Sequence, residues 1–162
     1  MLKIIILLIL LTFSIFAKSF NFTEIRYSDA IEKNIEQKGQ ITFFSNGIDI
    51  YYPETYKNLI YKDNNLVYEV DGEDKELGGI QEQKIIYYLD LLILLHSGDD
   101  NVISNIFKIS KYEKYMVLLP KNEMKNYIDK IELSRDNGLL KYFKLYLSNN
   151  DSITITIDNE IF

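Results

Sequence analysis

The side chains that most often do chemistry in proteins are sparse in this sequence. Its 162 residues include no cysteine and a single histidine, His96. Without a thiol there is no cysteine nucleophile and no cysteine metal site, and one histidine removes most zinc constellations. His96 ends an apolar segment, where the dipole of a helix favours a histidine, so we expect a structural role for it. The sequence predicts no catalytic residue and no bound metal.

Carboxylates are plentiful but form no catalytic pattern. Asp71, Glu73 and Asp74 lie close together, yet they lack the 12-residue ligand spacing and the closing Glu of an EF-hand, so a solvated acidic turn is predicted. No glycine-rich loop precedes a helix as phosphate sites require. The other carboxylates are scattered through turns, and a hydrolase with unrecognised carboxylates is the weakest hypothesis. The sequence favours a binding protein that is not an enzyme and has no cofactor.

Charge and the N-terminal segment bear on location and partners. The formal net charge is −6 and no basic patch is present, which argues against nucleic acid as a partner. Lys3, an apolar run over residues 4–16 and Ala17 are typical of a secretory signal peptide. A retained anchor is the alternative, but this run spans only about 20 Å of a roughly 30 Å bilayer core. We expect residues 1–17 to be a signal peptide and residues 18–162 to be one domain, soluble in the periplasm.

The longest apolar stretch beyond the leader is residues 84–97, KIIYYLDLLILLHS. It contains no Gly or Pro and ends at Ser97-Gly98, a frequent helix end. The predicted helix is apolar nearly all round, apart from a thin stripe formed by Gln83, Asp90 and Ser97. Such a helix must be covered on most sides. It is either permanent core or a lid over an apolar hollow that something else can occupy.

The segments around this helix are predicted strands. Before it, hairpins turn at Asn46-Gly47 and at residues 63–65, because Asn-Gly supplies the positive φ angles of a tight turn. Residues 72–83 are predicted to be a polar loop. After the helix, Asp99-Asp100 cap a short helix or turn, two strands surround a turn at 111–114, and a meander follows with turns at Asn137-Gly138 and Asn149-Asn150.

Residues 20–38 are ambiguous. Tyr27, Ile31 and Ile35 are spaced four apart, which favours an amphipathic helix, and an extended arm is the alternative.

Three stretches resemble the LolA-like periplasmic lipoprotein carriers. Residues 36–43 (EQKGQITF) are similar to that family's first Gly-led strand. Residues 50–53 (IYYP), 59–61 and 66–68 look like its aromatic second and third strands, and residues 115–121 (YMVLLPK) with 128–157 are similar to its C-terminal half.

The resemblance implies an unclosed antiparallel β-barrel, a curved sheet whose concave face is capped by helices. The chain would then carry acyl chains of lipoproteins, or a related lipid, toward the outer membrane, with an inner-membrane release complex and an outer-membrane acceptor as partners. The family commonly has Arg-Pro after the first strand, and that Arg helps hold the lid closed; here residues 44–47 read Phe-Ser-Asn-Gly. A non-enzymatic envelope scaffold without lipid cargo is the alternative.

Two sets of candidate site residues follow from the lid interpretation and the alternation of apolar residues along the strands. The predicted cavity residues are Ile41, Phe43, Ile50, Tyr61, Tyr68, Leu118, Phe143 and Ile155. The predicted lid residues are Ile85, Tyr88, Leu89, Leu92 and Leu95.

Overall fold

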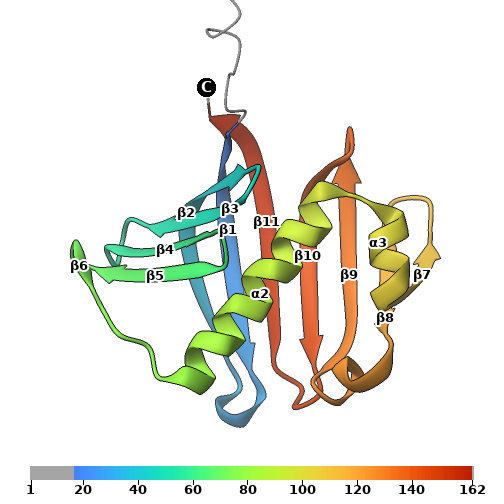
Figure 1. Ribbon diagram of the computed structural model, residues 1–162. Helices are drawn as coiled ribbons and strands as arrows, with labels where there is room; N and C mark the ends of the chain where they lie inside the picture. Colours follow the sequence, from blue (N-terminus) through green and yellow to red (C-terminus); the bar gives the residue numbers. More distant parts are fainter. Residues whose placement is uncertain (1–16, 162) are drawn as a thin grey trace, which may run out of the picture.

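The structure, a computed structural model, describes residues 17–161. The predicted signal peptide, apart from Ala17, lies outside the described residues. Eleven strands form one antiparallel sheet in the order β6-β5-β4-β3-β2-β1-β11-β10-β9-β8-β7. Its two end strands, β6 and β7, are not paired with each other, so the sheet stays open (Figure 1). The predicted fold class, an unclosed curved antiparallel sheet with helices on its concave face, is confirmed.

The sheet consists of two wings built from consecutive hairpins. The N-terminal wing comprises β2 (Lys33–Phe44), β3 (Gly47–Tyr52), β4 (Lys57–Lys62), β5 (Asn65–Val70) and β6 (Glu73–Asp74). The C-terminal wing comprises β7 (Phe107–Lys111), β8 (Met116–Pro120), β9 (Ile128–Asp136), β10 (Leu139–Leu147) and β11 (Ser152–Ile161). Short 3-10 turns at Asp29–Ile31 (η1) and Asn122–Asn126 (η2) connect neighbouring strands.

The wings join through β1 (Lys18–Ser28), which pairs with β2 on one side and with β11 on the other. Phe22 lies opposite Gly39 in β2 and opposite Ile157 in β11. A register shift between Phe20 and Phe22 interrupts the pairing with β11, and such irregularities increase the bend of a sheet.

The predicted helix over residues 20–38 is wrong. This stretch forms β1, η1 and the first half of β2. Phe20, Phe22 and Glu24 alternate with more exposed residues and face the core, whereas Ile31 and Ile35 are more than half exposed. The four-residue spacing was misleading because an alternating strand also repeats a side-chain direction every fourth residue.

Most of the predicted turns are present, but the first hairpin turns for a different reason from the one predicted. Asp63 and Asn64 have φ of 50° and 62°, and Asn137 and Gly138 have 50° and 81°, as tight hairpins require. The first hairpin turns at Ser45-Asn46 without a positive φ at either residue. Gly47 begins β3 directly against the backbone of Tyr61, where a Cβ would clash.

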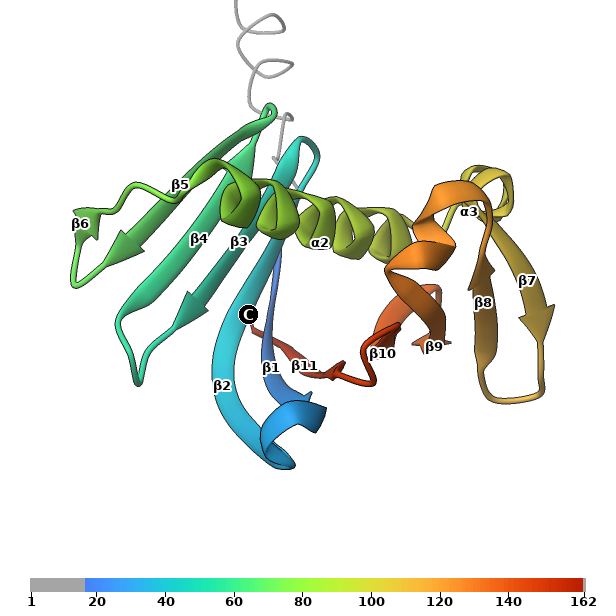
Figure 2. The ribbon, with the colours of Figure 1, turned by 90° about the horizontal axis from the view of Figure 1, so that it is seen from below.

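The central helix, α2 (Gly79–Ser97), crosses the concave face from one wing to the other (Figures 1 and 2). It begins at Gly79, so the predicted polar loop is shorter than expected and also contains β6. Gln83, Asp90 and Ser97 are exposed, as predicted for the polar stripe. The short α3 (Asp100–Ile106) follows, with the Asp99 carboxylate accepting hydrogen bonds from two backbone amides of its first turn. No helix within residues 17–161 is long and apolar enough to cross a membrane.

Candidate functional site

The predicted cavity residues gather under α2 from both wings. Seven of the eight are buried, namely Ile41, Phe43, Ile50, Tyr61, Leu118, Phe143 and Ile155. Tyr68 is half-buried and packs against the same cluster. Strands from both sides of the β1–β11 junction therefore contribute to one continuous apolar surface. Its role in holding lipid remains a prediction.

The predicted lid residues form the underside of α2. Leu89, Leu92 and Leu95 have no exposed surface, and Ile85 and Tyr88 are half-buried against the core. In this state the helix itself covers the apolar surface of the sheet, so a cargo chain there would have to displace it.

A buried carboxylate ties the middle of α2 to the sheet. Glu24 in β1 is 1% exposed. Its Oε2 accepts hydrogen bonds from the Tyr88 hydroxyl of α2 at 3.1 Å and from the Tyr52 hydroxyl of β3 at 3.2 Å. Arg26 Nε donates to its Oε1 at 2.6 Å. Because a charge is costly to bury without partners, these three donors are what make Glu24 tolerable in the core. We call Glu24, Arg26, Tyr52 and Tyr88 the Glu24 anchor.

The protonation states of the Glu24 anchor suit its geometry. Burial, and then the negative charge of Glu24, raise the pKa of Tyr52 and of Tyr88 above the ordinary tyrosine value. Both hydroxyls therefore keep their protons at neutral pH and act as donors. Burial lowers the pKa of Arg26, but Glu24 more than offsets this, so the guanidinium stays charged.

An arginine from the other wing holds the C-terminal end of α2. Arg135 in β9 donates from Nη2 to the carbonyl of Leu95 at 3.0 Å, and its Nη1 lies 3.2 Å from Asp100 Oδ1. A cation is favourable there because the last carbonyls of a helix carry partial negative charge. We call Arg135, Leu95 and Asp100 the Arg135 anchor.

His96 packs beside this second anchor. Its ring is stacked on Phe43, with centroids 3.6 Å apart and planes 1° from parallel. Burial, with the charges of Lys18 and Arg135, lowers the pKa of His96 to about 4, so the ring is neutral at pH 7. Its Nδ1 is buried without a hydrogen-bond partner among the described residues. The contacts fit the structural role predicted for it.

Sequence reasoning missed both anchors. Glu24 shares the strand parity of Phe20 and Phe22, and this period-2 pattern would have placed a carboxylate on the inner face had the stretch been assigned as a strand. Nothing in the local sequence around Arg135 indicates that it reaches α2, because its partner Leu95 is 40 residues away.

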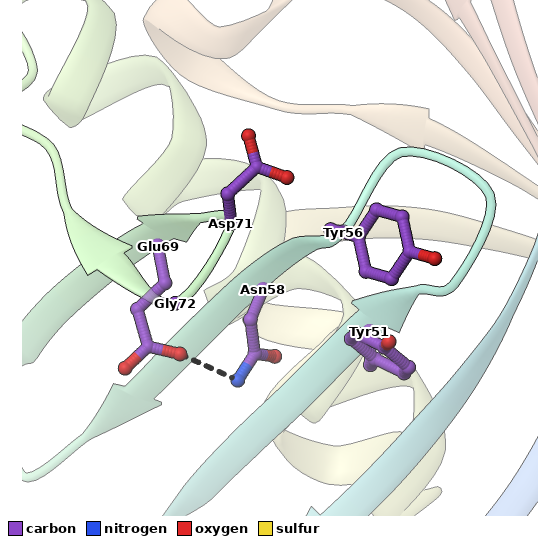
Figure 3. Close-up of a pocket in the computed structure, with 6 residues that line it drawn as sticks. All are labelled: Tyr51, Tyr56, Asn58, Glu69, Asp71 and Gly72. Carbon is purple, nitrogen blue, oxygen red and sulfur yellow. Dashed lines mark hydrogen bonds between the residues drawn. The ribbon is translucent and has the colours of Figure 1, made fainter.

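A pocket of about 370 Å³ lies on the other face of the sheet (Figure 3). Tyr51, Asn58 and Glu69 are aligned there across β3, β4 and β5, and Asn58 Nδ2 donates to Glu69 Oε2 at 3.1 Å. Their neighbours Tyr52 and Leu59 point into the core, so this pocket opens away from α2. Within the described residues no group of three or more His, Asp or Glu is placed to hold a metal ion.

No protein-family model matches this chain, and no curated protein sequence is similar to it. Solved structures with a similar arrangement include a LolA superfamily protein from Nitrosomonas europaea, with 9% identity over 91% of this chain and 86% of that chain and a TM-score of 0.41. Another is a putative outer membrane lipoprotein-sorting protein domain from Vibrio parahaemolyticus, with 8% identity over 90% of this chain and 85% of that chain and a TM-score of 0.44.

Proposed function

We propose that this protein is a periplasmic carrier that holds an acyl chain of a lipoprotein, or of a related lipid, between its sheet and α2 during transport toward the outer membrane. The observation that carries the proposal is the way α2 is attached. An apolar helix covers the concave face through side chains, and the sheet is complete without it.

The backbone hydrogen bonds support a detachable helix. Every strand finds its neighbour within the sheet, and among the described residues no backbone hydrogen bond joins α2 to a strand. Within the described residues, the polar links between α2 and the sheet include the Tyr88–Glu24 and Arg135–Leu95 hydrogen bonds, and Asp90 of α2 also interacts with the Tyr61 hydroxyl of β4. Lifting α2 therefore breaks a few side-chain polar contacts and a layer of apolar packing, and leaves the sheet's own hydrogen bonds intact.

The free energy lost when α2 leaves the sheet and the free energy gained when an acyl chain is buried in its place are of similar size. Exposing the four buried leucines of α2 costs about 6–12 kcal/mol at about 1.5–3 kcal/mol each. Burying an acyl chain of about 16 carbons is worth roughly 12 kcal/mol at ~0.8 kcal/mol per methylene. Because the two quantities are of similar size, exchange of the helix for a cargo chain is near balance, which permits both loading and release.

The sheet edges favour a carrier over a scaffold that pairs edge to edge with a partner. β6 is a strand of two residues, both acidic, and β7 carries Lys108 and Lys111. Short and charged edge strands are how proteins prevent strand addition. In a carrier, the donor and acceptor of the cargo would be an inner-membrane release complex and an outer-membrane acceptor.

Native mass spectrometry of the protein isolated from cells without detergent tests the proposal. We expect a population with a lipid-sized mass increment that disappears under denaturing conditions, and the released species identifies the cargo. A fluorescent fatty-acyl probe should bind the delipidated protein. Protein that carries no lipid and binds no acyl probe would contradict the carrier function.

A further inference from the structure

A second hollow lies where α2 begins. It has a volume of about 550 Å³ and lies between β5, the segment that returns from β6, and the first turn of α2. We call this hollow the α2 mouth, and its lining residues are Leu66, Val67, Tyr68, Asp74, Lys75, Glu76, Leu77 and Glu82.

The floor of the α2 mouth is continuous with the apolar core. Leu66 and Tyr68 line the mouth and also pack against the buried cluster beneath α2. An acyl chain that replaced the helix would therefore reach solvent here without crossing a polar barrier. The polar end of the cargo would then lie among the side chains of the rim.

The rim of the mouth is acidic. Its lining includes three carboxylates, Asp74, Glu76 and Glu82, and one lysine, Lys75. The Lys75 Nζ is already paired with Glu73, whose Oε2 lies 2.7 Å away outside the mouth. The N-terminal end of a helix carries partial positive charge and favours anions, but the Glu82 carboxylate in the first turn of α2 offsets this positive charge. The field at the mouth is therefore negative.

The mouth is also the loosely held end of α2. Gly78 at the start of the helix offers no side-chain cap, and Gly78 and Gly79 have open space around them. The opposite end is held by Arg135 and is followed directly by the capped α3. Displacement of α2 should begin at the mouth, next to the acidic rim.

We propose that the α2 mouth selects the polypeptide that follows the acylated end of the cargo, taking basic segments and rejecting acidic ones. This inference rests on the proposed carrier function. Charge complementarity to three rim carboxylates supplies the selection, and the acyl chain supplies most of the affinity.

Lauroylated peptides of matched length test the selection by displacement of a fluorescent acyl probe at low ionic strength. The probes are lauroyl-Gly-Lys-Lys, lauroyl-Gly-Ser-Ser and lauroyl-Gly-Glu-Glu, with dodecylphosphocholine as a lipid-type head. We expect the lysine peptide to bind about tenfold more tightly than the glutamate peptide, and this ratio to shrink at about 0.5 M salt. Dodecylphosphocholine should bind more weakly than the lysine peptide.

The double variant Glu76→Gln/Glu82→Gln should reduce the lysine-to-glutamate ratio to about twofold or less. Its matched control is Glu36→Gln/Glu113→Gln, which removes two exposed carboxylates away from the mouth and should leave the ratio unchanged. Equal binding of the lysine and glutamate peptides by the unaltered protein would overturn the inference while leaving the carrier function in place. So would a ratio unaffected by the mouth variant, or dodecylphosphocholine binding as tightly as the lysine peptide. Binding of none of the four probes would instead overturn the carrier function itself.

Discussion

Arg26 and Arg135 are the only arginines in the sequence, and each belongs to one of the two anchors that tie α2 to the sheet through a buried hydrogen-bond network or a helix end. Elsewhere the chain uses lysine for its positive charges. A guanidinium keeps its charge when buried and presents several donors in a fixed plane, which suits a buried carboxylate and a helix terminus better than a flexible ammonium does. Arginine therefore suits both anchors better than lysine would.

Replacing Tyr88 by Phe removes one donor from Glu24 and keeps the ring in place. Because hydrogen bonds to charged groups contribute about 1.5–3 kcal/mol, we expect the free energy of unfolding to fall by about 2 kcal/mol. The same change weakens the closed state, so an acyl probe should bind more tightly, by up to about 30-fold. Urea denaturation and probe titration measure the two effects. Tyr87→Phe, at a side chain 72% exposed on the same helix, should change neither. Lost stability without tighter probe binding would argue that α2 does not move.

His96 should make the stability depend on pH. Its pKa is about 4 in the folded protein and ordinary in the unfolded chain, so the unfolded chain takes up a proton first as the pH falls. The contribution of neutral His96 is present above pH 6.5 and is lost as the pH falls toward 4. His96→Phe, which retains an aromatic ring against Phe43, should show a smaller loss of stability between pH 7 and pH 4.5. Urea denaturation curves of the unaltered protein and of His96→Phe at three pH values measure this difference. Identical pH profiles of the two proteins would show that His96 does not cause the pH dependence.

At the scale of one element, α2 is apolar on its underside and carries polar residues at a seven-residue spacing on its outer face. Leu92→Asp tests whether that underside is a lid. If α2 can leave, the aspartate reaches water and the strands stay folded. Acyl-probe binding then falls by more than about tenfold, because the charge lies where the acyl chain meets the helix and this outweighs the weaker closed state. If α2 is permanent core, the buried carboxylate costs several kcal/mol and the protein unfolds. Circular dichroism melts and probe titration distinguish the two, with Tyr87→Asp as the control for an added charge on the exposed face.

Elements held by nearby residues could be predicted from the sequence, and elements held by distant ones could not. The turns at Asp63-Asn64 and Asn137-Gly138 were predicted because their backbone needs are local. The strand β1 was assigned as a helix because its four-residue spacing also fits a helical period, and its pairing with the distant β11 leaves no signal in the local sequence. The Glu24 anchor was missed for the same reason, since Tyr52 and Tyr88 are 28 and 64 residues away from the carboxylate.

The whole molecule consists of two wings of local hairpins joined at one long-range junction. β3 to β5 pair with their immediate neighbours, as do β9 and β10, whereas β1 pairs with the last strand. Contacts between distant residues form more slowly than local ones because a longer loop must close first. Pulse-labelled hydrogen exchange during refolding should protect amides of β4 and β10 before amides of β1 that bond to β11. Simultaneous protection of all strands would contradict this order.

Pairing the first strand with the last has a consequence for newly made chains. Until β11 has been synthesised, the edge of β1 that pairs with β11 has no partner. In the finished protein this edge lies in the middle of the sheet. A long unpaired strand edge is a template for another copy, and Phe20 and Phe22 give this one an apolar face. The interval before the C-terminal residues arrive is thus when the chain is most exposed to aggregation. A chaperone that shields β1 during that interval should raise the yield more than one that acts on the completed chain.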